Sequence, residues 1–205
     1  MTLADLDIDK RYTYADYFKW QFDERVEWIK GKIFQMRPAP GFIHQSISYI
    51  IHGELYLFLK DKKCKAYSAP FDVRFPLKSK KDEDIPPVLQ PDVSVICDQN
   101  KIDEKGCIGA PDIVVEILSP SNNKKDLKYK YNIYEESGVK EYWVIFPPEK
   151  NMLVYTLVNG KYVASPFLYP GDSVISTALP GFSLHLELLF GASNDKEYST
   201  INNAK

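Results

Sequence analysis

The chain has 205 residues, of which 44% are hydrophobic and 26% charged, a composition typical of globular domains. A formal net charge of −2 excludes a global basic field for nucleic acid, so any polyanion site has to be a local patch. No apolar run approaches the roughly 20 residues of a membrane span, and the acidic, polar start is unlike a secretory signal. We therefore expect one domain over residues 1–192, a flexible tail over 193–205 and no membrane partner.

The cysteines indicate a compartment. Cys64, Cys97 and Cys107 are odd in number and form no C-x-x-C pair. We expect free thiols in a reducing cytoplasm, and this spacing argues against a cysteine-based zinc site.

The first third of the chain carries helix and hairpin signals. Thr13 followed by Asp16 predicts a capped helix that continues to about Trp20. Residues 25–36 predict two short strands that turn at 30–31, a Lys-Gly pair. Residues 44–60 place apolar side chains at helical spacing, interrupted only by a glycine at 53, and so predict a helix.

Strand patterns follow, with one helix among them. Residues 65–77, 92–97 and 113–118 each predict a strand. Asn123 with Asp126 predicts the start of a helix that stops at Gly138. Residues 141–146 predict another strand, and 152–167 a hairpin with Asn159-Gly160 at its turn. This order predicts a mixed α/β sheet protein.

Two acids occupy positions where a sheet favours valine. Glu116 lies in the middle of the run Ile113 to Leu118, whose other residues suggest that both faces of the strand are apolar. Burying its carboxylate costs several kcal/mol unless the charge is paired or bound to a metal. Asp92 follows a proline and opens another β-branched run, and Asp72 is a third strand acid, for which an edge-strand charge is the alternative.

A lysine completes this pattern. Asp126 and Lys130 are four residues apart on the helix after the Glu116 strand and share a face, with Tyr134 one turn on. They form either a surface ion pair worth tenths of a kcal/mol, or a group in which Lys130 projects over the end of the strand. Two acids that hold a hard cation, with an ammonium nearby, are suited to phosphodiester hydrolysis. The metal stabilises negative charge on the phosphate and activates a bound water, and the ammonium neutralises developing charge. Oxygen ligands without a Cys/His cluster favour Mg²⁺ or Mn²⁺ over zinc.

The combined motifs resemble a known family. "PDVSVICD", then "PDIVVEILSPS", a D-x-x-x-K-x-x-x-Y-x-x-x-G run from Asp126 to Gly138, and "VKEYWVI" resemble the Uma-two family of restriction endonucleases, within the PD-(D/E)XK nuclease superfamily. The resemblance covers about residues 14–190. It implies an α/β (α+β), restriction-endonuclease-like mixed sheet flanked by helices, to which this chain adds a β-hairpin region on the C-terminal side. It also implies an endonuclease, for which we expect DNA as the substrate, Mg²⁺ or Mn²⁺ as the cofactor and the cytoplasm as the location.

The family motif assigns roles to individual residues. Asp92 matches the motif aspartate and Glu116 the acidic member of the (D/E)-x-K element, both as metal ligands. The third position of that element is Leu118 instead of lysine, and in several branches the lysine moves to the following helix. Lys130 is then the matching catalytic residue, with Lys128 as the alternative.

Further positions match the family. The resemblance favours Asp72 as a third metal ligand. The resemblance also implies accessory roles for Glu27 and His44. The alternative for Glu27 is an acid on the strand surface, and the alternative for His44 is a histidine that caps the helix or packs locally. Asp126, Lys128 and Tyr134 complete the accessory set. Lys124, Lys125, Lys128 and Lys130 form either a local anion-binding patch or an ordinary solvated helix face.

Three functions stay open. The first is the metal-dependent endonuclease, with DNA as the substrate. The second is an inactive nucleic-acid-binding or interaction module of the same fold, which the missing lysine at position 118 keeps open. The third is a metal-free hydrolase that uses two carboxylates. A homodimer suits the cutting of two antiparallel strands, and the β-rich C-terminal region is the interface we consider.

Overall fold

The computed structural model describes residues 26–29, 32–35, 41–75, 87–119 and 124–191. The helix expected at 13–20 and the tail expected at 193–205 lie outside these ranges. In the described part no helix is long and apolar enough to cross a membrane.

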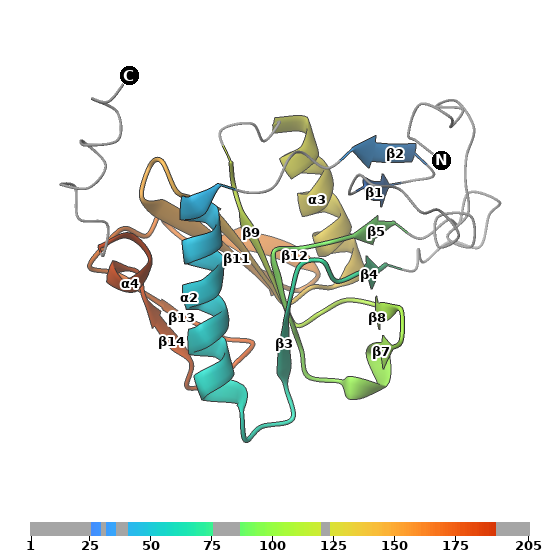
Figure 1. Ribbon diagram of the computed structural model, residues 1–205, viewed down its shortest axis with the longest axis horizontal. Coiled ribbons are helices and arrows are strands. Elements are labelled where there is room, and N and C mark those ends of the chain that lie inside the picture. Colours follow the sequence, from blue (N-terminus) through green and yellow to red (C-terminus); the bar gives the residue numbers. More distant parts are fainter. Residues whose placement is uncertain (1–25, 30–31, 36–40, 76–86, 120–123, 192–205) are drawn as a thin grey trace.

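A six-stranded mixed sheet forms the centre of the molecule (Figure 1). Its strand order is β12 (Lys161–Ala164), β11 (Asn151–Val158), β10 (Glu141–Phe146), β9 (Ile113–Ile117), β6 (Val93–Ile96) and β3 (Lys65–Ser68). β10 and β9 run parallel, whereas the other neighbours pair antiparallel. The predicted strands at 92–97, 113–118 and 141–146 are confirmed. The β11–β12 hairpin turns at Asn159 and Gly160, which both have the positive φ angles that such a turn requires.

A second mixed sheet lies beside the first (Figure 1). It contains, in order, β2 (Lys32–Gln35), β1 (Val26–Ile29), β5 (Val88–Leu89), β4 (Val73–Arg74), β8 (Gly106–Ile108) and β7 (Ile102–Asp103). β1 and β2 pair antiparallel, as the hairpin prediction required. A separate pair, β13 (Ser173–Ile175) and β14 (Ser183–His185), completes the strands of the described ranges.

The prediction of one strand over 65–77 is wrong. The chain leaves β3 after Ser68, passes a cis peptide bond between Ala69 and Pro70, and enters β4 in the other sheet. Proline has no N–H to give to a ladder, which explains why pairing stops there. Asp72 consequently lies before β4 instead of within a strand.

Helices cover both faces of the central sheet. α2 (Phe42–Leu59) and α4 (Glu187–Phe190) pack on one face, and α3 (Lys124–Ser137) packs on the other (Figure 1). A 3-10 turn, η2 (Gln99–Lys101), follows β6. Gly138 has φ +87° and ends α3, as predicted.

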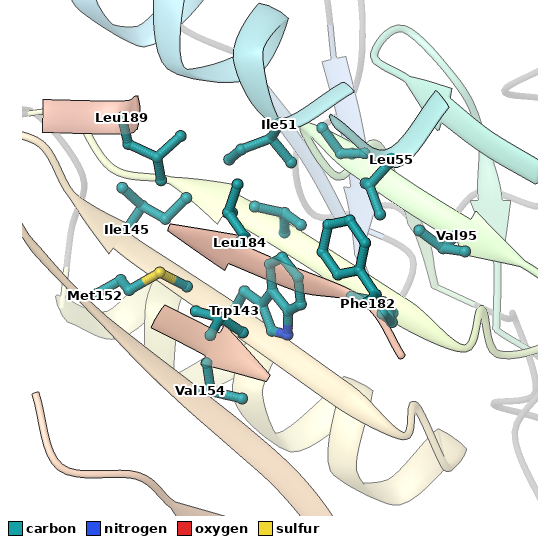
Figure 2. Packing of buried hydrophobic residues seen from close by; sticks show 14 of the residues in the cluster. Ile51, Leu55, Val95, Trp143, Ile145, Met152, Val154, Phe182, Leu184 and Leu189 are labelled. Carbon is teal, nitrogen blue, oxygen red and sulfur yellow. The ribbon is translucent and has the colours of Figure 1, made fainter. Parts of the chain in front are cut away.

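Two apolar clusters fill the two sides of this sheet. In the first, α2 contributes Ile51 and Leu55, which pack over Trp143 of β10 and Phe182 (Figure 2). In the second, Tyr134 of α3 packs over the opposite face, against Tyr142 and other buried residues. The strand that carries Glu116 is therefore buried from both sides, as its sequence suggested.

The expectation of three free thiols is also wrong. Cys64 and Cys97 form a disulfide, and only Cys107 is free. The register of β3 and β6 pairs Lys65 with Ile96, so the next residues outward on the two strands are the two bonded cysteines. Sequence spacing does not show this pairing, because it follows from how two strands meet. The free-thiol argument for a reducing cytoplasm loses its support.

Candidate active site

β6 and β9 bring Asp92 and Glu116 to the same end of the central sheet. The antiparallel register pairs Val93 with Val115, so the next position outward places Asp92 opposite Glu116. The Oδ2 atom of Asp92 accepts a 2.7 Å hydrogen bond from the backbone N–H of Ile117. This bond ties the aspartate, which precedes β6, to the strand that carries the glutamate.

Glu116 is a buried carboxylate whose oxygens both receive donors from α3. Its Oε1 accepts a 2.6 Å hydrogen bond from the hydroxyl of Tyr134, and its Oε2 lies 3.1 Å from Nζ of Lys130. Glu116 is 5% exposed and Lys130 6%. A pair buried this deeply differs from the surface ion pair considered for Lys130. The structure therefore brings together three of the residues that the sequence singled out.

His44 lies on the other side of Asp92. As the third residue of α2, it projects from the helix face that packs on the sheet, and its Nε2 is 3.2 Å from Oδ1 of Asp92. Its Nδ1 is buried and has no hydrogen-bond partner among the described residues. The imidazole thus contacts a predicted ligand directly, which goes beyond local helix capping.

Asp72 reaches the site indirectly. Its Oδ1 accepts a 2.8 Å hydrogen bond from Nε2 of Gln90, and Gln90 precedes Asp92 by two residues. The backbone of the same segment is also held, since the N–H of Cys107 donates to the carbonyl of Asp72 at 2.8 Å. Gln90 had not been singled out from the sequence. The only signal was its place next to the Pro-Asp pair.

Tyr142 is a second polar group that sequence analysis missed. Its ring lies in the same apolar cluster as Tyr134, and its hydroxyl has no hydrogen-bond partner in the described part of the chain. Burial, helped by the negative charge of Glu116, raises the pKa of Tyr142 well above its usual value. The phenol therefore stays neutral and adds no second negative charge beside the glutamate.

Of the other predicted accessory residues, only Lys128 has a described side chain. Lys128 is exposed on α3 and lies two residues before the buried Lys130. Glu27 lies on β1, opposite Phe34 of β2. The backbone of Asp126 belongs to α3. The side chains of Glu27, Asp126, Lys124 and Lys125 are outside the described part of the structure.

The donor set suits a hard divalent cation. Asp92 and Glu116 supply carboxylate oxygens on neighbouring strands, and Mg²⁺ commonly uses one or two carboxylates and keeps waters or phosphate oxygens as its other ligands. Within the described residues no three His, Cys, Asp or Glu side chains form a group that holds a metal. A site with carboxylate oxygens as its main donors favours Mg²⁺ or Mn²⁺ over zinc.

Two other buried acids have a structural explanation. Glu141 accepts hydrogen bonds from the indole of Trp143 and from the backbone N–H groups of Thr177 and Ala178. Asp112 accepts one from the backbone N–H of Cys97 and pairs with a lysine at 140. Both carboxylates hold loops to the sheet. They differ from Glu116, which is met by the side chains of Lys130 and Tyr134 from α3.

Comparisons with known proteins give the family and the fold. The Uma2 family model, described as "Putative restriction endonuclease", matches residues 14–187. A solved structure from Anabaena variabilis ATCC 29413, described as "a putative nuclease belonging to DUF820", is 23% identical to the chain. The match covers 88% of this chain and 98% of that one, with a TM-score of 0.69. At this identity the likeness shows the fold. No curated protein matches the chain.

Proposed function

Because the chain belongs to the Uma2 family of restriction endonucleases, we propose that it is a metal-dependent endonuclease that hydrolyses phosphodiester bonds in DNA. One observation carries the proposal: Glu116, buried on a strand beside Asp92, is met by the ammonium of Lys130 from the next helix. Desolvation of two opposite charges offsets much of their attraction, so a buried ion pair contributes little net stability and its presence favours a role beyond packing. A DNA substrate makes the cytoplasm the proposed location.

Each residue of the cluster has a proposed role. Asp92 and Glu116 would hold Mg²⁺, which supplies charge neutralisation at the phosphate and lowers the pKa of bound water. Lys130 pairs with Glu116 and would place a positive group beside the scissile phosphate. Tyr134 fixes the second oxygen of the glutamate, and His44 orients the carboxylate of Asp92.

The remaining acid has a supporting role in this proposal. Asp72 is the candidate third ligand, and Gln90 holds its carboxylate in the observed position. Lys128 is exposed on α3. It would contact phosphate oxygens outside the cluster, as part of a local anion-binding patch.

The first test is metal binding. We expect the wild type to bind Mn²⁺ and Mg²⁺ by calorimetry, and Asp92→Asn and Glu116→Gln to lose this binding while keeping a cooperative thermal transition. Both substitutions keep side-chain size and remove one charge. Glu104→Gln is the matched control because Glu104 is an exposed acid, and its binding should equal that of the wild type.

The same proteins then test the reaction. Supercoiled DNA incubated with wild type and Mg²⁺ or Mn²⁺ should be cleaved, and EDTA, Asp92→Asn or Glu116→Gln should abolish cleavage. Metal binding without cleavage of any DNA or RNA would favour the inactive nucleic-acid-binding module. Cleavage that survives EDTA would favour a hydrolase that uses the two carboxylates alone.

A further inference from the structure

The outer face of α2 carries an exposed aromatic stripe. Phe42, Tyr49 and Tyr56 are 75%, 80% and 61% exposed. They are spaced seven residues apart, so they lie along one side of the helix. Ile47, Ile51 and Leu55 face the sheet from the opposite side. A helix that is apolar on both sides is normally covered on both sides.

This face has almost no charge. Among the 18 residues of α2 the only Asp, Glu, Lys or Arg is Glu54. A solvent-facing helix side normally carries charged residues, whereas the core of a protein interface is depleted in them and enriched in aromatic side chains. The absence of lysine and arginine from α2 argues against a nucleic acid as the occupant, because phosphates require cations.

A glycine lies in the middle of the same stripe. Gly53 costs about 0.5–1 kcal/mol relative to alanine in a helix interior. An added Cβ at Gly53 would meet nothing within 4 Å, and its φ angle is not positive. Neither crowding within the chain nor backbone conformation explains the glycine. Close approach of another molecule explains it, since a small residue lets a large side chain reach the helix backbone.

The spacing of large and small residues is self-complementary. The large residues at 42, 49 and 56 alternate with slimmer or flexible ones, Ser46, Gly53 and Lys60. In an antiparallel pair of α2 helices centred on residue 51, Tyr49 meets Gly53 of the second copy and Tyr56 meets Ser46. Phe42 meets Lys60, a cation–π arrangement like that of Lys62 over Phe58 in this chain. Because the pair has two-fold symmetry, each of these contacts occurs twice.

The available area is close to what a dimer requires. Aromatic side chains bury about 150–250 Å² each, so the exposed parts of the stripe and of its neighbours Ile43 and Leu57 amount to roughly 600 Å². Stable interfaces bury about 800 Å² per partner, and the residues between the aromatic positions contribute further area. We propose that the outer face of α2 is the interface with a second copy of this chain, packed antiparallel about a two-fold axis.

Sedimentation equilibrium of the full chain over a wide concentration range tests this proposal. The wild type should give twice the chain mass of 23.6 kDa. Tyr49→Asp and Gly53→Leu should both give the single-chain mass. Gly53→Leu is the sharper variant, because leucine favours a helix and meets no obstacle within the chain. It should raise the melting temperature of the monomer while abolishing the dimer.

Val163→Asp is the matched control. Val163 is a 56% exposed apolar residue on β12, in the β-rich region considered from the sequence as the interface. It should leave the dimer intact. A monomeric wild type, or a dimer that Val163→Asp dissociates and Tyr49→Asp does not, overturns the proposal. These outcomes are independent of nuclease activity, so failure here is distinct from failure of the proposed function.

Discussion

Two side chains of α3 meet the buried carboxylate of Glu116. Lys130 supplies the positive charge and Tyr134 a short hydrogen bond. In a buried pair, removal of one partner leaves an uncompensated charge, which costs about 3–5 kcal/mol. Lys128 lies only two residues from Lys130 but is exposed. The two side chains have the same chemistry and differ in their burial.

Substitution of these two lysines separates their roles. Lys130→Met should lower the free energy of unfolding by about 3–5 kcal/mol and abolish cleavage, as measured by urea denaturation and plasmid assay. Lys128→Met should change stability by less than about 0.5 kcal/mol. The double variant Glu116→Gln/Lys130→Met should regain stability and remain inactive. If Lys130→Met and the wild type had the same free energy of unfolding, Lys130 would not be the group that compensates the buried charge of Glu116.

Elements with a strong local signal could be predicted from the sequence. β9, β10 and α3 have clear periodicity, and the β11–β12 turn has Asn159-Gly160. The two-residue strands β4, β5 and β7 have no such signal, because only their neighbours in space define them. Ala69-Pro70 interrupts the strand predicted over 65–77, because a proline has no N–H to continue the pairing.

The site was only partly predictable for a related reason. Lys130 was found because α3 directly follows the strand of Glu116. Glu141 and Asp112 are also buried carboxylates at strand starts, and their function in holding loops depends on long-range partners. Sequence patterns therefore indicate which acids are buried, and three-dimensional contacts separate structural acids from catalytic candidates.

The disulfide gives a prediction for the element pair β3 and β6. Burial raises the pKa of the Cys107 thiol to about 11, so a thiol reagent should find no reactive cysteine in the native protein near pH 8. Unfolding without reductant should expose only Cys107, and reduction should expose Cys64 and Cys97 as well. All three thiols reacting after unfolding without reductant would contradict the disulfide.

For the whole molecule, the proposed dimer sets the relation between two active sites. His44 projects from the side of α2 opposite the aromatic stripe, so antiparallel pairing places the two His44–Asp92 contacts on opposite outer sides. They are about 21 Å apart along the helix axis, from 14 residues at 1.5 Å each. The two sites then cannot act together on opposed phosphates of one duplex.

This arrangement predicts nicking of supercoiled DNA. Nicked circles should accumulate before linear product, because each strand is cut in a separate event. The monomeric Tyr49→Asp variant should give the same order of products as the wild type, as followed by gel electrophoresis over time. Linear product that appears as early as nicked circles in the wild type, but not in the variant, would contradict back-to-back sites.

α3 supplies both the charge and the hydroxyl that meet Glu116, and it packs on the sheet through apolar residues that include Ile133 and Tyr134. Proteins open in cooperative parts at free energies below that of global unfolding. If α3 opens before the rest of the molecule, the acid loses these two partners while the sheets are still folded. Heat or mild denaturant should therefore inactivate the protein before it unfolds, and amide hydrogen exchange in α3 would report the fraction of molecules able to catalyse.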